Sequence, residues 1–166
     1  MLTCIFGENS SGKSRWAESL VAETKGPRYY IATMVPYGEA GAQKVEKHRK
    51  QRENLGFTTL EDPELRDTAR IPQDAVVLLE DISNLLANRM FTGSGDWQGV
   101  ARDVEKLADN CGALFVVSIT GLRREEYEGE TAAYIDALNS LNEALVCRAD
   151  RVYEMRNGVA ILQKGE

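Results

Sequence analysis

The sequence predicts an α/β domain with a mostly parallel central sheet and a C-terminal β-hairpin. Short apolar segments alternate with longer amphipathic segments along the chain, as expected when strands alternate with helices. The apolar run at residues 75–79 contains no polar residue, which is typical of a central parallel strand buried on both faces. The pair Asn157-Gly158 separates two short strand-like segments near the end of the chain and predicts a type I′ turn. We therefore expect three layers, with helices on both faces of one sheet.

The individual elements follow from the same patterns, taken in chain order. Strands are placed at short runs of apolar and β-branched residues, and helices where apolar residues recur every three or four positions. The last helix is the clearest, because Tyr134, Leu138, Leu141 and Leu145 share one face. The predicted strands are 2–6, 29–32, 57–60, 75–79, 113–119, 151–155 and 159–163, and the predicted helices are 13–23, 42–54, 82–91, 96–110 and 130–148.

Length and charge restrict the class of protein. The 166 residues fit a single domain spanning 1–166, and 26 acidic against 20 basic side chains give a net charge of -6. This charge argues against a protein whose main partner is nucleic acid or an anionic membrane. The apolar runs are far shorter than the roughly 18 residues of a spanning helix, and the first residues lack the basic flank of a signal peptide.

The three cysteines predict a reducing compartment. Cys4, Cys111 and Cys147 are widely spaced, and none belongs to a Cys-x-x-Cys pair. This pattern suggests neither a disulfide framework nor a zinc site, so we expect core cysteines and a cytoplasmic protein.

Residues 7–14 carry the most specific motif. They read Gly-Glu-Asn-Ser-Ser-Gly-Lys-Ser and fit the phosphate-loop pattern G-x-x-x-x-G-K-[ST] at every position. The motif lies between a predicted strand and a predicted helix, where backbone N–H groups and the helix dipole can surround a phosphate. Lys13 is expected to reach the outer phosphates of a nucleotide, and the Ser14 hydroxyl to coordinate Mg²⁺. The prediction is a P-loop NTPase-like domain; the alternative is a glycine- and serine-rich turn that only caps a helix.

Two acidic residues follow the buried strand at 75–79. Glu80 and Asp81 are expected at the carboxyl end of this strand, where sheets of this type bind ligands. Proteins often hold Mg²⁺ through one or two carboxylates together with water, so Glu80, ahead of Asp81, is a candidate Mg²⁺ anchor. The alternative is that both are ordinary strand-end acids or N-caps of the helix that begins at Ile82.

His48 is the single histidine of the chain. On the helix predicted over 42–54 it shares a face with Val45, Arg52 and Leu55. A neutral imidazole is a good nucleophile toward phosphorus, and arginines stabilise the charge that develops. The alternative is a histidine on a solvated helix face, since the surrounding residues are highly charged.

These motifs resemble, in order and spacing, the adenosylcobinamide kinase/adenosylcobinamide-phosphate guanylyltransferase family. The resemblance covers nearly the whole chain, although only the phosphate loop is specific by itself. It rests on that loop and on Tyr30-Ile31-Ala32-Thr33, His48-Arg49-x-x-Arg52, Leu78-Leu79-Glu80, Asn88, Tyr134-Ile135-Asp136, Leu141-Asn142-Glu143, Ala149-Asp150, Gly158 and Lys164.

The resemblance implies a bifunctional, homo-oligomeric enzyme of cobalamin biosynthesis that uses GTP or ATP and Mg²⁺. Such an enzyme phosphorylates a hydroxyl of adenosylcobinamide and then transfers GMP to adenosylcobinamide phosphate through a guanylylated histidine. By position, His48 and Lys13 would be catalytic, and Ser14 and Glu80 would hold the metal. The implied nucleotide-binding residues are Gly7, Glu8, Asn9, Ser10, Ser11, Gly12, Lys13, Ser14, Thr33, Met34, Val35, Arg49, Lys50, Gln51, Arg52, Glu61 and Glu80.

One segment departs from the family pattern. After the strand at 113–119 the family typically has Asn-Glu-Val-Gly and a glycine-rich stretch, whereas this chain has Ser118-Ile119-Thr120-Gly121 and a shorter connection. If this change removes the kinase chemistry, the protein guanylylates itself but does not phosphorylate adenosylcobinamide. Two other functions stay open: a small-molecule kinase or NTPase of another pathway, which would not need His48, and a nucleotide-binding protein without catalysis.

Overall fold

The computed structural model describes residues 1–35 and 38–166. Within these residues the core is a seven-stranded sheet with the order β3-β2-β4-β5-β1-β6-β7. All neighbouring strands pair in parallel except β7, which pairs antiparallel with β6. The predicted mostly parallel sheet with a C-terminal hairpin is confirmed. The strands are β1 (Leu2–Gly7), β2 (Arg28–Ala32), β3 (Phe57–Glu61), β4 (Val76–Glu80), β5 (Ala113–Ile119), β6 (Arg151–Arg156) and β7 (Val159–Lys164).

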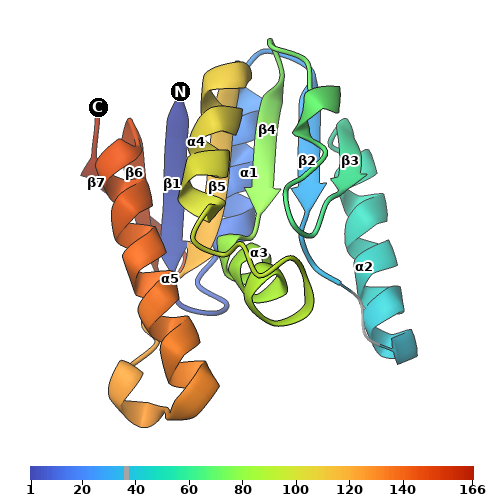
Figure 1. Cartoon of the computed structure of the whole chain (residues 1–166). Coiled ribbons are helices and arrows are strands. Elements are labelled where there is room, and N and C mark those ends of the chain that lie inside the picture. Colours follow the sequence, from blue (N-terminus) through green and yellow to red (C-terminus); the bar gives the residue numbers. More distant parts are fainter. Residues whose placement is uncertain (36–37) are drawn as a thin grey trace.

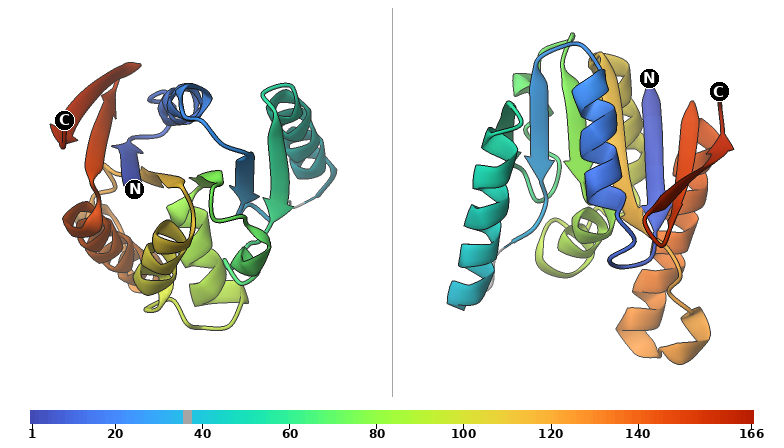
Figure 2. Two further views of the ribbon diagram at one scale, coloured as in Figure 1. Left: turned by 90° about the horizontal axis from the view of Figure 1, so that it is seen from above. Right: turned by 180° about the vertical axis from the view of Figure 1, so that it is seen from behind.

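Helices cover both faces of the sheet, as expected for three layers (Figures 1 and 2). Helix α1 packs on one face, α3, α4 and α5 pack on the other, and α2 lies beside the edge strand β3. No helix in the described part of the chain is both long and apolar enough to cross a membrane. The helices are α1 (Lys13–Glu23), α2 (Gly38–Glu53), α3 (Ile82–Ala87), α4 (Val100–Asn110) and α5 (Gly129–Arg148), with short turns η1 (Thr68–Arg70), η2 (Asn88–Thr92) and η3 (Arg124–Glu126).

The central strands are buried on both faces because their side chains alternate between two apolar clusters. In β1, Cys4 belongs to the cluster beneath α3, α4 and α5, whereas Ile5 belongs to the cluster beneath α1. Leu78 and Leu79 in β4 divide in the same way, and all four side chains are fully buried. The continuous apolar run in the sequence therefore reflects burial on both sides.

The structure corrects two predicted helices. The helix predicted over 82–91 is α-helical only to Ala87 and continues as a π-helical turn, and the helix predicted over 96–110 begins at Val100. The buried side chain of Arg89 explains the later start. Its Nη1 donates to the carbonyl of Asp96 at 3.2 Å, its Nε donates to the carbonyl of Glu64 at 2.9 Å, and its Nη2 pairs with Asp103 at 2.8 Å. Residues 96–99 therefore form a loop that supplies an acceptor to a buried cation.

Burial and backbone dihedral angles test the predictions for the hairpin turn, the cysteines and Leu55. Asn157 and Gly158 both have positive φ, 50° and 78°, which confirms the type I′ turn of the hairpin. Cys4 and Cys111 are buried, but Cys147 is exposed, so the expectation of three core cysteines is wrong for Cys147. Leu55 lies beyond the end of α2 and is 38% exposed, so it does not extend the apolar face of that helix.

Asp81 is the N-cap of α3. Its carboxylate accepts hydrogen bonds from the Asn84 N–H at 2.7 Å and from the Ser83 hydroxyl at 2.5 Å. We expect Asp81→Ala to lower the free energy of unfolding by about 1 kcal/mol, the usual effect of losing such a cap, and Asp81→Asn to retain most of it. Urea denaturation measures both variants. Equal midpoints for wild type and Asp81→Ala would contradict the capping role.

Candidate functional site

The phosphate loop follows β1 and leads directly into α1, as its sequence predicts. Two glycines are required by the backbone: Gly12 has φ +94°, and a Cβ on Gly7 would lie 2.5 Å from the Ser11 hydroxyl. Neighbouring segments hold the loop on both sides. The N–H of Thr120 donates to the Gly7 carbonyl, and the N–H of Gly158 donates to the Ser11 carbonyl, both at 3.1 Å. The end of β5 and the β6–β7 turn therefore fix the shape of the loop.

Lys13 reaches back across this loop. Its ammonium group donates to the carbonyl of Glu8 at 2.5 Å, and the side chain is 9% exposed. Burial lowers the pKa of Lys13, and the carboxylates of Asp81 and Glu80 oppose this shift. The ammonium group is therefore positioned inside the loop, where the outer phosphates of a nucleotide would bind.

Glu80 lies at the end of β4 with both carboxylate oxygens in use. The Ser14 hydroxyl donates to Oε1, and the Tyr30 hydroxyl donates to Oε2 at 2.7 Å. Burial and the nearby Glu80 charge raise the pKa of Tyr30, so its hydroxyl remains a proton donor. Ser14 and Glu80 together provide hard oxygen ligands that fit Mg²⁺.

Within the described residues, no three His, Cys, Asp or Glu side chains cluster as a metal site. Phosphate oxygens and water would complete the coordination of a Mg²⁺ ion held by the Ser14 hydroxyl and the Glu80 carboxylate, as is common for Mg²⁺ in nucleotide sites.

Helix α2 is anchored to the sheet through Arg52. Its guanidinium carbon lies 3.7 Å from the centroid of the Tyr30 ring, and this ring also packs edge-on against Phe57 at 6.0 Å. The Arg52 side chain is buried, and its Nε has no hydrogen-bond partner among residues 1–35 and 38–166. A buried donor of this kind is available to a ligand in the adjoining cavity.

A cavity of about 470 Å³ joins α2 to the ends of β2 and β4. His48 is exposed at its wall, and the cavity also contains the Ser14–Glu80 pair. The structure therefore brings the candidate nucleophile and the candidate metal ligands into one space. Residues predicted from the sequence that line it are Ser14, Met34, Val35, His48, Arg52, Glu61 and Glu80; the others are Glu18, Tyr30, Ala32, Lys44, Val45, Pro63, Asp81 and Asn84.

The remaining predicted residues lie outside this cavity. Thr33 is buried, and its hydroxyl donates to the Glu80 carbonyl at 3.0 Å and accepts from the Asp81 N–H at 2.8 Å, so it supports the end of β4. Arg49 pairs with Glu53 at 3.6 Å on the exposed side of α2. Other residues of the set are either exposed on α2 (Lys50 and Gln51) or part of the phosphate loop (Gly7, Glu8, Asn9, Ser10, Ser11, Gly12 and Lys13).

Sequence reasoning missed Tyr30 as a site residue. Tyr30→Phe removes the hydrogen bond to Glu80 but keeps the ring beneath Arg52. Because a hydrogen bond to a charged group contributes about 1.5 kcal/mol, we expect the Mg²⁺ concentration for half-maximal nucleotide binding to rise about tenfold. A Mg²⁺ titration with a fluorescent nucleotide measures this, with Tyr29→Phe on the same strand as the control. If Tyr30→Phe and Tyr29→Phe require the same Mg²⁺ concentration, Tyr30 does not orient the Glu80 carboxylate for the metal.

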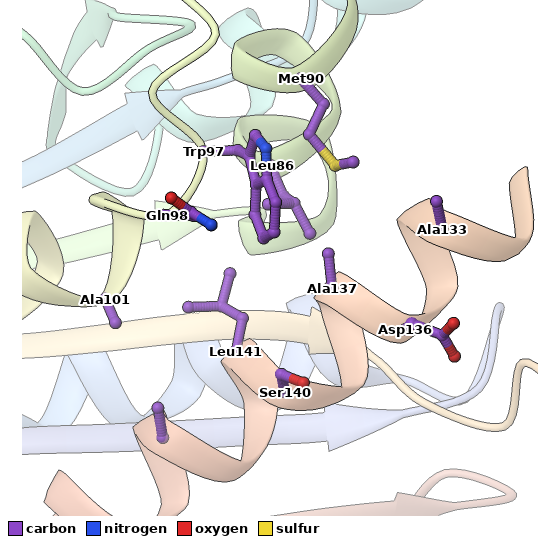
Figure 3. Close-up of a pocket in the computed structure, with 11 residues that line it drawn as sticks. Leu86, Met90, Trp97, Gln98, Ala101, Ala133, Asp136, Ala137, Ser140 and Leu141 are labelled. Carbon is purple, nitrogen blue, oxygen red and sulfur yellow. The ribbon is translucent and has the colours of Figure 1, made fainter. Parts of the chain in front are cut away.

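A cavity of about 540 Å³ lies away from the phosphate loop, between α3, α4 and α5 (Figure 3). Its walls are mainly apolar, with Leu86, Trp97 and Leu141 facing its centre. Its acidic residue, Asp136, is paired with Arg124 at 3.0 Å. None of the phosphate loop, His48 and Glu80 lines this cavity, so it is separate from the candidate site.

Three features together define a P-loop nucleotide-binding protein. They are the parallel sheet, the phosphate loop after β1, and a carboxylate at the end of β4, which β5 separates from β1. Comparison with solved structures agrees: a prototypical ATPase from the type III secretion system of pathogenic bacteria superposes with a TM-score of 0.57 at 10% identity, covering 98% of this chain and 56% of that one. This likeness supports the fold alone. The model of the family "Cobinamide kinase / cobinamide phosphate guanyltransferase" matches residues 3–162, so the chain belongs to this family.

Two curated relatives match over nearly their whole lengths. Bifunctional adenosylcobalamin biosynthesis protein CobP of Pseudomonas aeruginosa is 31% identical over 173 residues, covering 100% of this chain and 99% of that protein. Bifunctional adenosylcobalamin biosynthesis protein CobU of Escherichia coli K12 is 25% identical over 179 residues, covering 97% of this chain and 98% of that protein. The family resemblance noted in the sequence is confirmed, and the chain is an enzyme of the kinase/guanylyltransferase type.

Proposed function

We propose that this protein phosphorylates adenosylcobinamide and then transfers GMP from GTP to adenosylcobinamide phosphate through His48. The observation that carries this proposal is the shared cavity, in which His48 lies on α2 and Ser14 and Glu80 lie beside the phosphate loop. A P-loop enzyme that only phosphorylates a small molecule has no need for a histidine on this wall. The names of the curated relatives and of the matching family support the same function.

The transfer of GMP follows from the placement of these groups. A nitrogen of neutral His48 forms a bond to the α-phosphorus of GTP, the bond from this phosphorus to the bridging oxygen breaks, and pyrophosphate leaves with the electron pair. Lys13 would bind the β- and γ-phosphates, and the unpaired Nε of Arg52 would stabilise the charge on the α-phosphate. A phosphate oxygen of adenosylcobinamide phosphate then attacks the same phosphorus, and the bond to His48 breaks.

Mg²⁺, held by Ser14 and Glu80, would neutralise phosphate charge when the nucleotide is bound. GTP is the proposed guanylyl donor, and either GTP or ATP the phosphoryl donor. The partner is the corrinoid substrate, and neither nucleic acid nor a membrane is part of the proposal. We also propose that the chain is a single domain over 1–166 and that it forms a homo-oligomer in the cytoplasm. The grounds are its charge, its cysteine pattern and the family resemblance.

The decisive experiment incubates the protein with Mg²⁺ and GTP labelled at the α-phosphate, followed by denaturation and intact-mass measurement. We expect a covalent gain of one GMP per chain, and loss of that mass when adenosylcobinamide phosphate is added. Active protein that never carries the adduct would leave only the kinase function.

The kinase step is tested separately, because Ser118-Ile119-Thr120-Gly121 lacks the family's acid. We expect ATP, Mg²⁺ and adenosylcobinamide to give adenosylcobinamide phosphate, detected by chromatography and mass spectrometry. Absence of this product from protein that still forms the GMP adduct would show that the altered segment has lost the kinase chemistry.

A further inference from the structure

Asn88 belongs to the motif pattern of the sequence, but the proposed chemistry does not use it. It is the residue at which α3 ends and the π-helical turn η2 begins. Turns of this kind occur frequently at functional sites. Asn84, four residues earlier on the same helix, lines the cavity that contains His48, so Asn88 lies one helical turn beyond this cavity.

The side chain of Asn88 joins the ends of two neighbouring strands. Its Nδ2 donates to the Thr33 carbonyl at 2.7 Å and to the Pro63 carbonyl at 2.8 Å. Thr33 follows β2 and Pro63 lies just after β3, and these strands pair in parallel. One amide group therefore sets the spacing between the segments that leave the two strands.

The bond from Asn88 completes the anchoring of Thr33. The N–H and the hydroxyl of Thr33 both donate to the Glu80 carbonyl, at 3.3 and 3.0 Å. The Thr33 carbonyl is bound by Asn88, so every backbone polar group of this residue has a partner. Met34 and Val35, which line the cavity, therefore begin from a fixed residue.

The segment after β3 is held by the same turn of helix. Arg89 donates to the Glu64 carbonyl at 2.9 and 2.6 Å, so consecutive side chains of η2 bind the consecutive carbonyls of Pro63 and Glu64. The N–H of Asp62 also donates to the last carbonyl of β2 at 3.0 Å. Because these other bonds remain, we expect loss of the Asn88 amide to shift Pro63 rather than to unfold the segment.

The residues that Asn88 holds form the β2–β3 wall of the cavity, which consists of Met34, Val35, Glu61 and Pro63. In the strand order, β2 and β3 lie farther from the phosphate loop after β1 than β4 does (Figure 1). A nucleotide whose outer phosphates bind the loop and Lys13 would therefore extend its nucleoside toward this wall.

We propose that Asn88 is a positioning residue: it fixes the β2–β3 wall and thereby sets the affinity for the nucleoside part of GTP. This inference rests on the proposed function, in which GTP binds in this cavity. Both hydrogen bonds that Asn88 donates go to backbone carbonyls, so it acts through the wall and not by contact with the nucleotide.

Asn88→Asp tests the proposal with almost no change of shape. The carboxylate has no donor and faces two carbonyl oxygens, which must move apart. Isothermal titration calorimetry with Mg²⁺ measures the dissociation constants of GTP and of inorganic tripolyphosphate. Since donors to two carbonyls are lost, we expect the value for GTP to rise about tenfold. Tripolyphosphate reaches only the loop, so its value should change by less than about twofold.

Two controls separate positioning from a general loss of stability. Asn139→Asp is the same chemical change at an exposed position of α5, and it should leave both dissociation constants unchanged. Val104→Ala removes buried apolar contacts in α4, and it should lower Tm without changing the ratio of the two constants. Equal losses for GTP and tripolyphosphate in Asn88→Asp, or no loss for GTP, would overturn the proposal.

If Asn88→Asp does not fold, as judged by circular dichroism, Asn88→Ala decides. It removes both donors without adding a charge, and we expect a weaker but equally selective loss of GTP affinity; an unselective result would refute the positioning role. The outcomes also separate this inference from the proposed function. Selective loss of GTP affinity without any GMP adduct in the wild type would retain the role of Asn88 and refute that of His48. An adduct in the wild type with unchanged GTP affinity in Asn88→Asp would refute only the positioning role.

Discussion

Replacing His48 with alanine is expected to abolish the covalent GMP adduct completely. A phosphoramidate on histidine is cleaved by acid, because protonation of its nitrogen makes a good leaving group, and it survives base. An ester on Ser10, Ser11 or Ser14 would largely survive acid. Wild-type protein treated with GTP and Mg²⁺ should therefore carry one acid-labile, base-stable GMP, measured by intact mass after each treatment. The variant should still bind GTP, since the phosphate loop does not depend on this exposed side chain.

Lys47→Ala is a matched control for this experiment. Lys47 is the neighbouring exposed residue of α2 and does not line the cavity, so the adduct should form normally. An adduct of equal size in His48→Ala would place the nucleophile elsewhere. The guanylyltransferase mechanism through His48 would then be wrong, even if the protein proved to be a kinase.

Lys13→Ala is expected to abolish nucleotide-induced thermal stabilisation. A nucleotide at 100 times its dissociation constant adds about 2.7 kcal/mol to the free energy of unfolding, which is about 5–10 °C in Tm for a domain of this size. Lys13 is the buried cation inside the loop, and without it the outer phosphates lose their main counter-charge. Differential scanning fluorimetry with GTP or ATP and Mg²⁺ measures the effect.

Lys25→Ala, at an exposed position after α1, provides the control and should retain the full shift. Lys13→Met separates charge from packing, because it fills the same space without the ammonium group. We expect it to behave like Lys13→Ala. A normal shift in either Lys13 variant would mean that the loop does not bind the outer phosphates as proposed.

Local sequence patterns were sufficient for the sheet and the phosphate loop, because both depend on neighbouring residues. Strand burial in β4 and β5 shows directly as unbroken apolar runs, and the loop is a contiguous motif. Tyr30 could not be recognised in this way. In the sequence it is one aromatic residue of a strand, and only the pairing of β2 with β4 brings its hydroxyl to Glu80.

The same limit applies to the charged residues. Arg49 and Arg52 are the same type of residue on the same helix, but only Arg52 faces the sheet, where it packs on Tyr30. Helical spacing predicted that Arg52 shares a face with His48, yet it could not show that Tyr30 would lie beneath it. The start of α4 was missed for a related reason, since the acceptor that Asp96 supplies to Arg89 becomes visible only in three dimensions.

The position of β1 in the sheet has a consequence for biosynthesis. Its two neighbours are β5, where Leu114 pairs with Leu2, and β6, where Arg151 pairs with Thr3. The phosphate motif therefore leaves the ribosome before the partners of its strand, and this strand cannot pair until more than a hundred further residues have emerged. Until then both edges of an apolar strand are open to other chains. We therefore expect nucleotide binding to be acquired late in synthesis, and incomplete chains to aggregate before they can bind a nucleotide.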